Sequence, residues 1–152
     1  ARARVETPWG DVGAVLNGGG NLRKNFAGKL ALVAPALAAA GCSAEELSFY
    51  GDVRVRNVRP TLTGALRGER LVCGNGSAAV DSPQIALDVS LAETLQSWRG
   101  TADASLAKLK AGRMNAKKLG LRARFSGSAA RTTLDGSAEG AELSAGDFSA
   151  RR

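Results

Sequence analysis

Large apolar residues alternate with polar ones along most of this chain, and one short phrase recurs within that alternation. The phrase is a bulky apolar residue, a spacer, a glycine, a second spacer and a small or apolar residue. Four copies and two looser ones stand at residues 49–53, 98–102, 125–129, 134–138, 26–30 and 16–20. A period of two residues is that of a β-strand, whose successive side chains point to opposite faces. Each copy therefore predicts a strand with one apolar face on which the glycine leaves a gap.

The same alternation predicts the remaining strands and the turns between them. Strands are expected over residues 2–7, 11–17, 26–34, 46–56, 62–66, 71–73, 85–92, 102–106 and 119–125, with weaker ones around Leu134, Leu143 and Phe148. Turns are expected at residues 8–10, at Gly18-Gly19-Gly20-Asn21 and at Asn75-Gly76. Because Pro35 has no amide proton for a central ladder, the strand that reaches it should end or bulge there.

Two segments allow a helical alternative. Residues 35–45 are rich in alanine and fit a short helical turn. In residues 90–98, Ser90 and Glu93 form a capping box, and Leu91, Leu95 and Trp98 have helical spacing. Long helices do not alternate with the strands anywhere in the sequence, which disfavours a parallel α/β sheet. We therefore predict an all-β meander with at most a short helix.

Composition argues against a densely packed globule. The 152 residues suffice for one domain, and the hydrophobic fraction of 44% consists largely of alanine. Glycine occurs 19 times, well above its background of roughly 7%. Alanine and glycine bury little area, and burial stabilises by only about 25 cal/mol per Å², so a compact core would be weak. The composition favours one repetitive segment, residues 1–152, in which each strand packs on its neighbours.

The chain is basic, with 21 Lys and Arg against 14 Asp and Glu and a net charge of +7. Such a charge suits nucleic acid or anionic lipid. The cations, however, alternate with apolar residues, as at Arg54 and Arg56, so they are expected on the solvated face of strands. A platform for single-stranded nucleic acid combines cations with aromatic side chains, whereas here the aromatics fall on the opposite face. We therefore expect no nucleic-acid partner.

The residues of the commonest catalytic and metal sites are missing. The sequence has no histidine, which removes the commonest general base and the Ser-His-Asp and Cys-His arrangements. The carboxylates are scattered, and residues 18–20 lack the lysine and the strand-to-helix context of a phosphate loop. Two cysteines without histidine match no zinc signature. We therefore expect no enzyme, no cofactor and no metal.

Cys42 and Cys73 are the only cysteines. They form either one disulfide, which closes a loop of about 30 residues and stabilises by about 3 kcal/mol, or two buried free thiols. We favour the disulfide. No signal peptide and no apolar run of about 20 residues is recognisable. Because the chain opens in mid-pattern at residues 1–5, we expect it to be a segment of a larger protein.

Several of the glycine-centred motifs resemble a known family. The run from Trp98-Arg99-Gly100-Thr101-Ala102 through residues 106–112 to residues 119–127 is similar to the YdbH family, and so is Gly41-Cys42 leading into residues 49–53. These are AsmA-like proteins, relatives of TamB, from the envelope of Gram-negative bacteria. The similarity extends from about Val5 to Phe148 as a pattern of strands and glycines, without a catalytic motif.

The resemblance implies an elongated, curved antiparallel sheet whose apolar concave face is a groove for lipid. Such proteins look like bridges, anchored in the inner membrane, that carry phospholipid across the periplasm to the outer membrane. This chain would be one segment of the bridge, without the anchor. Its partners would be phospholipid acyl chains, neighbouring segments of the same protein and, through the whole protein, both membranes. The periplasm would also be an oxidising compartment for the two cysteines.

The lipid interpretation assigns a role to one apolar row. The residues expected to line the groove are Leu47, Phe49, Gly51, Val53, Val55, Ile85, Leu87, Val89, Leu91, Leu119, Leu121 and Phe125. Glycines such as Gly51, Gly100 and Gly127 would let the sheet curl and would leave room for an acyl chain. Cations along the rim would attract phosphate, and the candidates are Arg54, Arg56, Lys110 and Arg122.

Two other interpretations of the same pattern remain open. Half-buried strands alternate in the same way when they line the closed core of a sandwich or barrel. Strands rich in glycine and alanine also build extracellular β-solenoids and adhesins that transport no lipid. The phrase recurs at irregular intervals, which fits antiparallel strands of unequal length better than the coils of a solenoid.

Overall fold

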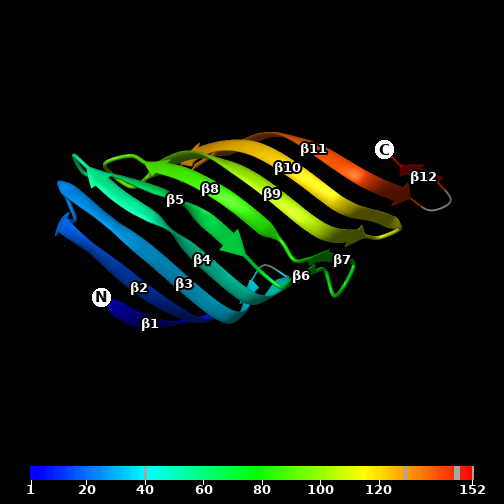
Figure 1. Ribbon diagram of the computed structural model, residues 1–152, viewed down its shortest axis with the longest axis horizontal. Helices are drawn as coiled ribbons and strands as arrows, with labels where there is room; N and C mark the ends of the chain where they lie inside the picture. The colour runs from blue at the N-terminus through cyan, green and yellow to red at the C-terminus, as the bar shows by residue number, and fades with distance from the viewer. Residues whose placement is uncertain (40, 129, 146–147, 152) are drawn as a thin grey trace.

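The computed structural model describes residues 1–39, 41–128, 130–145 and 148–151, which form a single antiparallel sheet of 12 strands (Figure 1). The strands are β1 (Arg2–Thr7), β2 (Gly10–Asn21), β3 (Asn25–Ala39), β4 (Cys42–Arg56), β5 (Arg59–Arg67), β6 (Arg70–Cys73), β7 (Ala78–Asp81), β8 (Gln84–Leu91), β9 (Ser97–Ala111), β10 (Met114–Ser128), β11 (Thr132–Ala145) and β12 (Phe148–Arg151). These residues contain no helix. The all-β prediction is confirmed.

The strands follow one another across the sheet in nearly their order in the sequence. The path runs β1-β2-β3-β4-β5-β8-β9-β10-β11-β12, while β6 lies between β4 and β7, and β7 between β6 and β9. Strands β5 and β6 therefore form one interrupted strand, and β7 and β8 form the next one. The result is a meander of long hairpins, as the sequence predicts, and every pairing is antiparallel, unlike the coils of a parallel β-solenoid.

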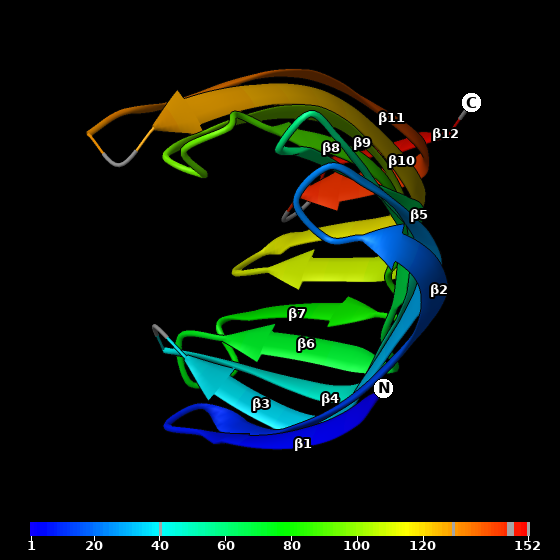
Figure 2. The same ribbon diagram turned by 90° about the vertical axis from the view of Figure 1, so that its left-hand side faces the viewer.

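The sheet is bent into a trough that stays open along one side. Seen end on, it has the outline of a letter C (Figure 2). Its accessible surface is 10730 Å², whereas a compact protein of 15.6 kDa exposes roughly 7,200 Å². Among the described residues, no large side chain falls below 2% exposure. A single sheet without a second layer explains both values, so the described residues form neither the sandwich core nor the closed barrel that the pattern also allowed.

The strands bend along one line, which we call the crease. Its residues are Pro35, Glu46, Gly68, Glu69, Ser82, Pro83, Ala107 and Lys118. On β3 and β4, Pro35 and Glu46 have no ladder partner, and the same is true of Ala107 and Lys118 on β9 and β10. Between them, the Glu69 amide donates to the Glu45 carbonyl at 3.1 Å. The crease therefore crosses neighbouring strands at one level and folds the sheet there.

Each bulge at the crease also changes which residues of a strand share a face. In β4 the apolar face carries Leu47 and Phe49 on one side of the crease and Ala44 on the other, so the alternation changes from odd to even positions. Strand β10 changes in the same way between Leu119 and Ala116. Because the sequence changes its pattern together with the backbone, one apolar face continues through the bend.

The turn predicted at residues 18–21 is wrong, and neither of the two helical alternatives is found in the described residues. Residues 18–21 do not turn but continue β2, and the turn follows at residues 22–24. Residues 35–39 and 41–45 hold no helical turn, because β3 bulges at Pro35 and continues to Ala39 and β4 begins at Cys42. Residues 92–96 form a hairpin turn between β8 and β9 and not a capped helix. No helix suited to crossing a membrane occurs in the part of the chain that the structure describes.

Candidate functional site: the apolar concave face

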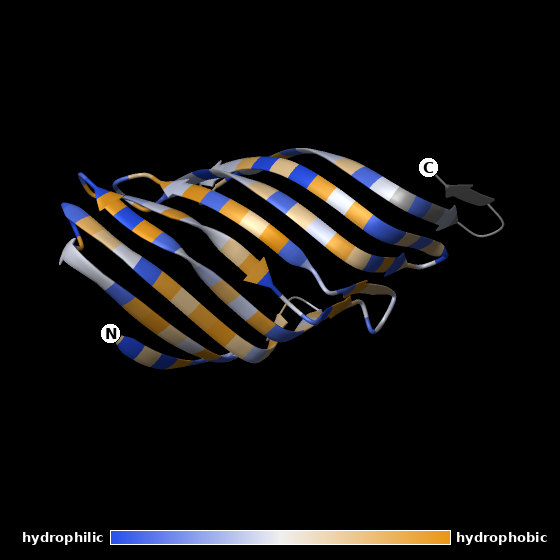
Figure 3. Cartoon of the chain, in the orientation of Figure 1, coloured by the Kyte–Doolittle hydropathy of each residue, from blue (hydrophilic) through white to orange (hydrophobic). Residues whose placement is uncertain are grey.

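The register brings all twelve residues predicted to line a groove onto one face of the sheet. Directly paired residues share a face, so each step across the ladder can be followed. Phe49 pairs with Leu66, which pairs with Ile85, and Ile85 pairs with Ala104, which pairs with Leu121. A second row runs from Val53 through Leu62, Val89 and Gly100 to Phe125. Figure 3 shows the matching alternation of apolar and polar residues along the strands.

Burial identifies this face as the inner one. The side chains below about a tenth exposure on it include Phe26, Phe49, Val55, Leu106 and Leu119. Their neighbours on the opposite face, such as Arg54 and Arg56, are exposed. Since no second layer covers the sheet in the described residues, this burial comes from the curvature and from adjacent side chains. Most other members, among them Leu87 and Leu121, are only half-buried and stay accessible from inside the trough.

The recurring phrase has a structural explanation that differs from the predicted one. The ring of Phe49 lies over Gly51 of its own strand and over the paired Gly64, where an added Cβ would be 2.8 Å and 2.7 Å from the ring Cζ. Phe26 covers Gly28 and Gly18 in the same way, at 2.8 Å and 2.7 Å. The glycines therefore let an aromatic ring lie flat on the backbone, and the predicted gap at Gly51 is filled.

Strands β9 and β10 use the same device reciprocally. The phrases that begin at Trp98 and Phe125 pair head to tail, so that Trp98 faces Gly127 and Gly100 faces Phe125. A Cβ on Gly127 would lie 2.9 Å from three atoms of the Trp98 indole, and a Cβ on Gly100 would lie 2.8 Å from Phe125 Cζ. The prediction that Gly100 and Gly127 leave room for an acyl chain is therefore wrong, because rings occupy both places.

Sequence reasoning missed several members of this face. The most buried is Ala116 at 3% exposure, beyond the crease in β10. Ala116 and Leu119 share a face although they are three positions apart, because the bulge at Lys118 inserts one residue between them. A search for strict alternation with a period of two cannot detect such an inserted residue. Phe26 is also buried, and the loose phrase at residues 26–30 was a sufficient signal for it.

The opposite, convex face carries the charges, as predicted. Cross-strand ion pairs join Lys29 to Asp52 and Arg122 to Asp103, each at 2.8 Å. The hydrogen bond that Lys29 donates to the Asp52 carboxylate, reinforced by the negative charge of Asp52, raises the pKa of Lys29 above its usual value, and Asp103 raises the pKa of Arg122 in the same way. Because these pairs are largely exposed, they contribute to register and solubility more than to stability.

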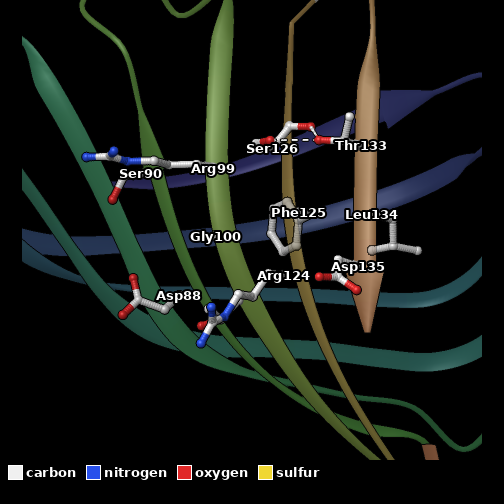
Figure 4. A pocket seen from close by; sticks show the side chains of 11 residues that line it. Asp88, Ser90, Arg99, Gly100, Arg124, Phe125, Ser126, Thr133, Leu134 and Asp135 are labelled. Atoms are coloured by element: carbon white, nitrogen blue, oxygen red, sulfur yellow. Dashed lines mark hydrogen bonds between the residues drawn. The ribbon is translucent and has the colours of Figure 1, made fainter. Parts of the chain in front are cut away.

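A hollow of about 480 Å³ lies among the ends of β8 to β11 and is lined mainly by polar side chains (Figure 4). Its carboxylates, Asp88 and Asp135, stand three strands apart in register, which corresponds to about 14 Å. This exceeds the 5–9.5 Å or so that separates the two carboxylates of a glycosidase. No group of metal-binding side chains occurs among the described residues. The hollow therefore has no recognisable catalytic arrangement.

Cys42 and Cys73 form a disulfide between β4 and β6. They are direct register partners beyond the crease, on the side of the sheet that carries the β6–β7 turn. The covalent link joins strands that are separated by 31 positions in the sequence. It therefore ties β4 to β6 in the lower arm of the C, which contains the short strands β6 and β7 (Figure 2).

Comparison of the chain with protein-family models, with curated proteins and with solved structures found no match. The features on which a function can be based are consequently those of the chain itself: the register, the burial and the charges described above.

Proposed function

We propose that the chain is a lipid-binding segment whose concave face holds acyl chains, as part of a bridge that transfers phospholipid between the membranes of a Gram-negative envelope. One observation carries the proposal: an apolar face continues across the sheet from β1 to β11 and has no protein layer over it in the described residues. Soluble monomers rarely expose apolar patches of more than a few hundred Å². An uncovered apolar face of this extent therefore indicates that an apolar ligand or partner binds there.

An acyl chain suits this face in shape and chemistry. The accessible rows contain aliphatic side chains and no charged group, so they offer nothing that a polar ligand would need. Removing one methylene from water is worth about 0.8 kcal/mol, so a 16-carbon chain half covered by the trough gains roughly 6 kcal/mol. The headgroup would remain in water at the open side. Nothing in this role requires a catalytic residue, a metal or a cofactor.

The disulfide supports the placement in the periplasm. Disulfides persist in oxidising compartments and are rare in the cytosol. Cys42–Cys73 is such a bond, and it lies within the trough-forming sheet and not at a separate redox site. The resemblance to AsmA-like proteins points to the same compartment.

The test is lipid extraction and mass spectrometry of the chain, expressed into the periplasm and purified without detergent. Phospholipid should co-purify with the wild type and should be lost when Leu87 or Leu121 is replaced by Asp. Ser90→Asp is a matched control, because Ser90 lies on β8 as Leu87 does but on the convex face beside Arg99. A lipid-free wild type that stays folded and monomeric would refute the proposal.

A charged residue in the trough could instead unfold the protein, so a second measurement keeps the test independent of folding. A photo-reactive phenylalanine analogue placed at Leu87 should crosslink to phospholipid, whereas the same analogue at Ala86, one residue away on the convex face, should not. Equal crosslinking at both positions would indicate contact with lipid that does not involve the trough.

A further inference from the structure

Three hairpin turns form one continuous edge of the sheet, which we call the turn rim. It consists of residues 22–24 between β2 and β3, residues 57–59 where β4 turns into β5, and residues 93–95 between β8 and β9. The amides of Asn57 and Val58 donate to the carbonyls of Lys24 and Arg23, at 2.9 Å and 2.8 Å. Arg59 then pairs with Glu93 at 3.2 Å. The three turns are thus held together as one ordered surface, along the same edge in Figures 1 and 2.

Each turn presents a large aliphatic side chain to solvent. Leu22 is 62% exposed, Val58 47% and Leu95 57%. Val58 and Leu95 also adopt the left-handed conformation, with φ of 64° and 58°. A bulky residue is rare there, and it is costly for a β-branched one, since a two-residue turn of this kind prefers Asn-Gly. Neither residue repays that cost by packing in the protein.

Positively charged side chains surround the three exposed aliphatic residues and lie close enough to repel one another. Arg56 and Arg59 are direct register partners, and like charges directly opposite each other destabilise a sheet. With Arg54 they line a hollow of about 580 Å³ on the convex side of the rim, completed by Asn57, Thr61 and Glu93. Arg23 and Lys24 add two further positive charges beside Leu22. An anionic partner would relieve this repulsion.

We propose that the turn rim docks on an anionic lipid surface, with Leu22, Val58 and Leu95 inserted among the headgroups and the arginine hollow around a lipid phosphate. Aliphatic tips interleaved with Arg and Lys are the composition of segments that lie at membrane interfaces. The rim has no aromatic side chain on which a nucleic-acid base could stack, which disfavours that anionic partner. This contact is distinct from the trough, and it goes beyond the proposed carriage of lipid.

The test is flotation of the purified chain with vesicles of phosphatidylcholine alone or with about 30% phosphatidylglycerol. Binding is expected only to the anionic vesicles, and it should weaken as salt rises. Arg56→Gln should weaken it about fivefold, whereas Arg113→Gln, the same substitution in the exposed turn between β9 and β10 at the opposite edge, should not. Flotation with neutral vesicles, or with neither kind, would overturn the proposal.

Val58→Gly separates docking from a structural role, because it creates the preferred Asn-Gly turn. Its Tm should rise by roughly 2–4 °C while anionic-vesicle binding falls several-fold. Trp9→Ser removes an exposed apolar tip from the opposite edge and is the control. If both variants weaken binding equally, the rim is not the docking surface. If Val58→Gly instead abolishes a concentration-dependent dimer, a second copy occupies the rim and the proposal fails.

Discussion

The aromatic lids over glycine predict a large effect for a very small substitution, Gly127→Ala. The added Cβ would lie 2.9 Å from Cε2, Cζ2 and Nε1 of Trp98, so the indole must move by about 0.5 Å or more to reach ordinary contact. An aromatic side chain buries about 150–250 Å², worth about 4–6 kcal/mol at 25 cal/mol per Å². If the shift uncovers a third to a half of that area, the free energy of unfolding falls by about 2 kcal/mol.

The assay is urea unfolding followed by circular dichroism, with a thermal melt that should shift by roughly 4–8 °C. Gly19→Ala is the matched control, because Gly19 also lies in a strand but its Cβ would meet nothing within 4 Å. Removing the conformational freedom of that glycine should leave stability unchanged or raise it by up to about 1 kcal/mol. Tryptophan emission, recorded with Trp9→Phe, should shift to the red in Gly127→Ala as the indole of Trp98 is uncovered.

A double-mutant cycle identifies the cause. In a Trp98→Leu background the ring is absent, so Gly127→Ala should become nearly neutral, which gives a coupling energy of at least about 1 kcal/mol. If Gly127→Ala costs the same with and without the indole, the loss comes from the backbone and the explanation of the recurring phrase is refuted. Equal costs for Gly127→Ala and Gly19→Ala would refute it as well.

Three further predictions concern the crease, the disulfide and the convex face. Lys118 bulges with φ of 51°, so Lys118→Gly should raise the free energy of unfolding, measured by urea unfolding, by up to about 1 kcal/mol, whereas Lys117→Gly, on regular strand, should lower it. Replacing Cys42 and Cys73 with Ser opens a link across 31 positions and should cost about 3–4 kcal/mol, a fall in Tm of roughly 10 °C that excess reductant should reproduce in the wild type. The raised pKa of Lys29 implies a stabilising contribution that is present below pH 10.5 and is lost as the pH rises further. Urea midpoints measured at pH 9 and at about pH 11.5 should show this loss in the wild type, and Asp52→Asn should abolish it. If the pH dependence is unchanged in Asp52→Asn, the ion pair is not its source.

The sequence predicted faces better than it predicted turns and bends. Alternation placed Leu47 and Phe49 on the face that they share, because a period of two survives wherever the ladder is regular. It failed at residues 18–21, since glycines that look like a turn can equally be required by a ring; here Phe26 lies over Gly18. That choice depends on a contact between two strands, which local sequence does not contain.

The crease was foreseen at only one place. Because Pro35 lacks an amide proton, the sequence predicted that the strand ends or bulges there, and the structure shows a bulge. Glu46 and Lys118 are ordinary residues whose left-handed backbone, with φ of 50° and 51°, follows from the line of bends across neighbouring strands. The candidate site was therefore predicted on one side of the crease and missed beyond it, at Ala44 and Ala116, where the alternation had changed.

The length of the trough follows directly from the number of strands along the sheet. The ten strands along the path are separated by nine spacings of about 4.8 Å, which give a trough of about 43 Å. Inserting or deleting one whole hairpin would change that length by about 10 Å, because each described strand contacts only the strands with which it pairs in the sheet. The cross-section would stay the same, since the crease sets it within each strand. The length and the cross-section of the trough are thus independent in this fold, and duplication of hairpins can lengthen the trough without changing its cross-section.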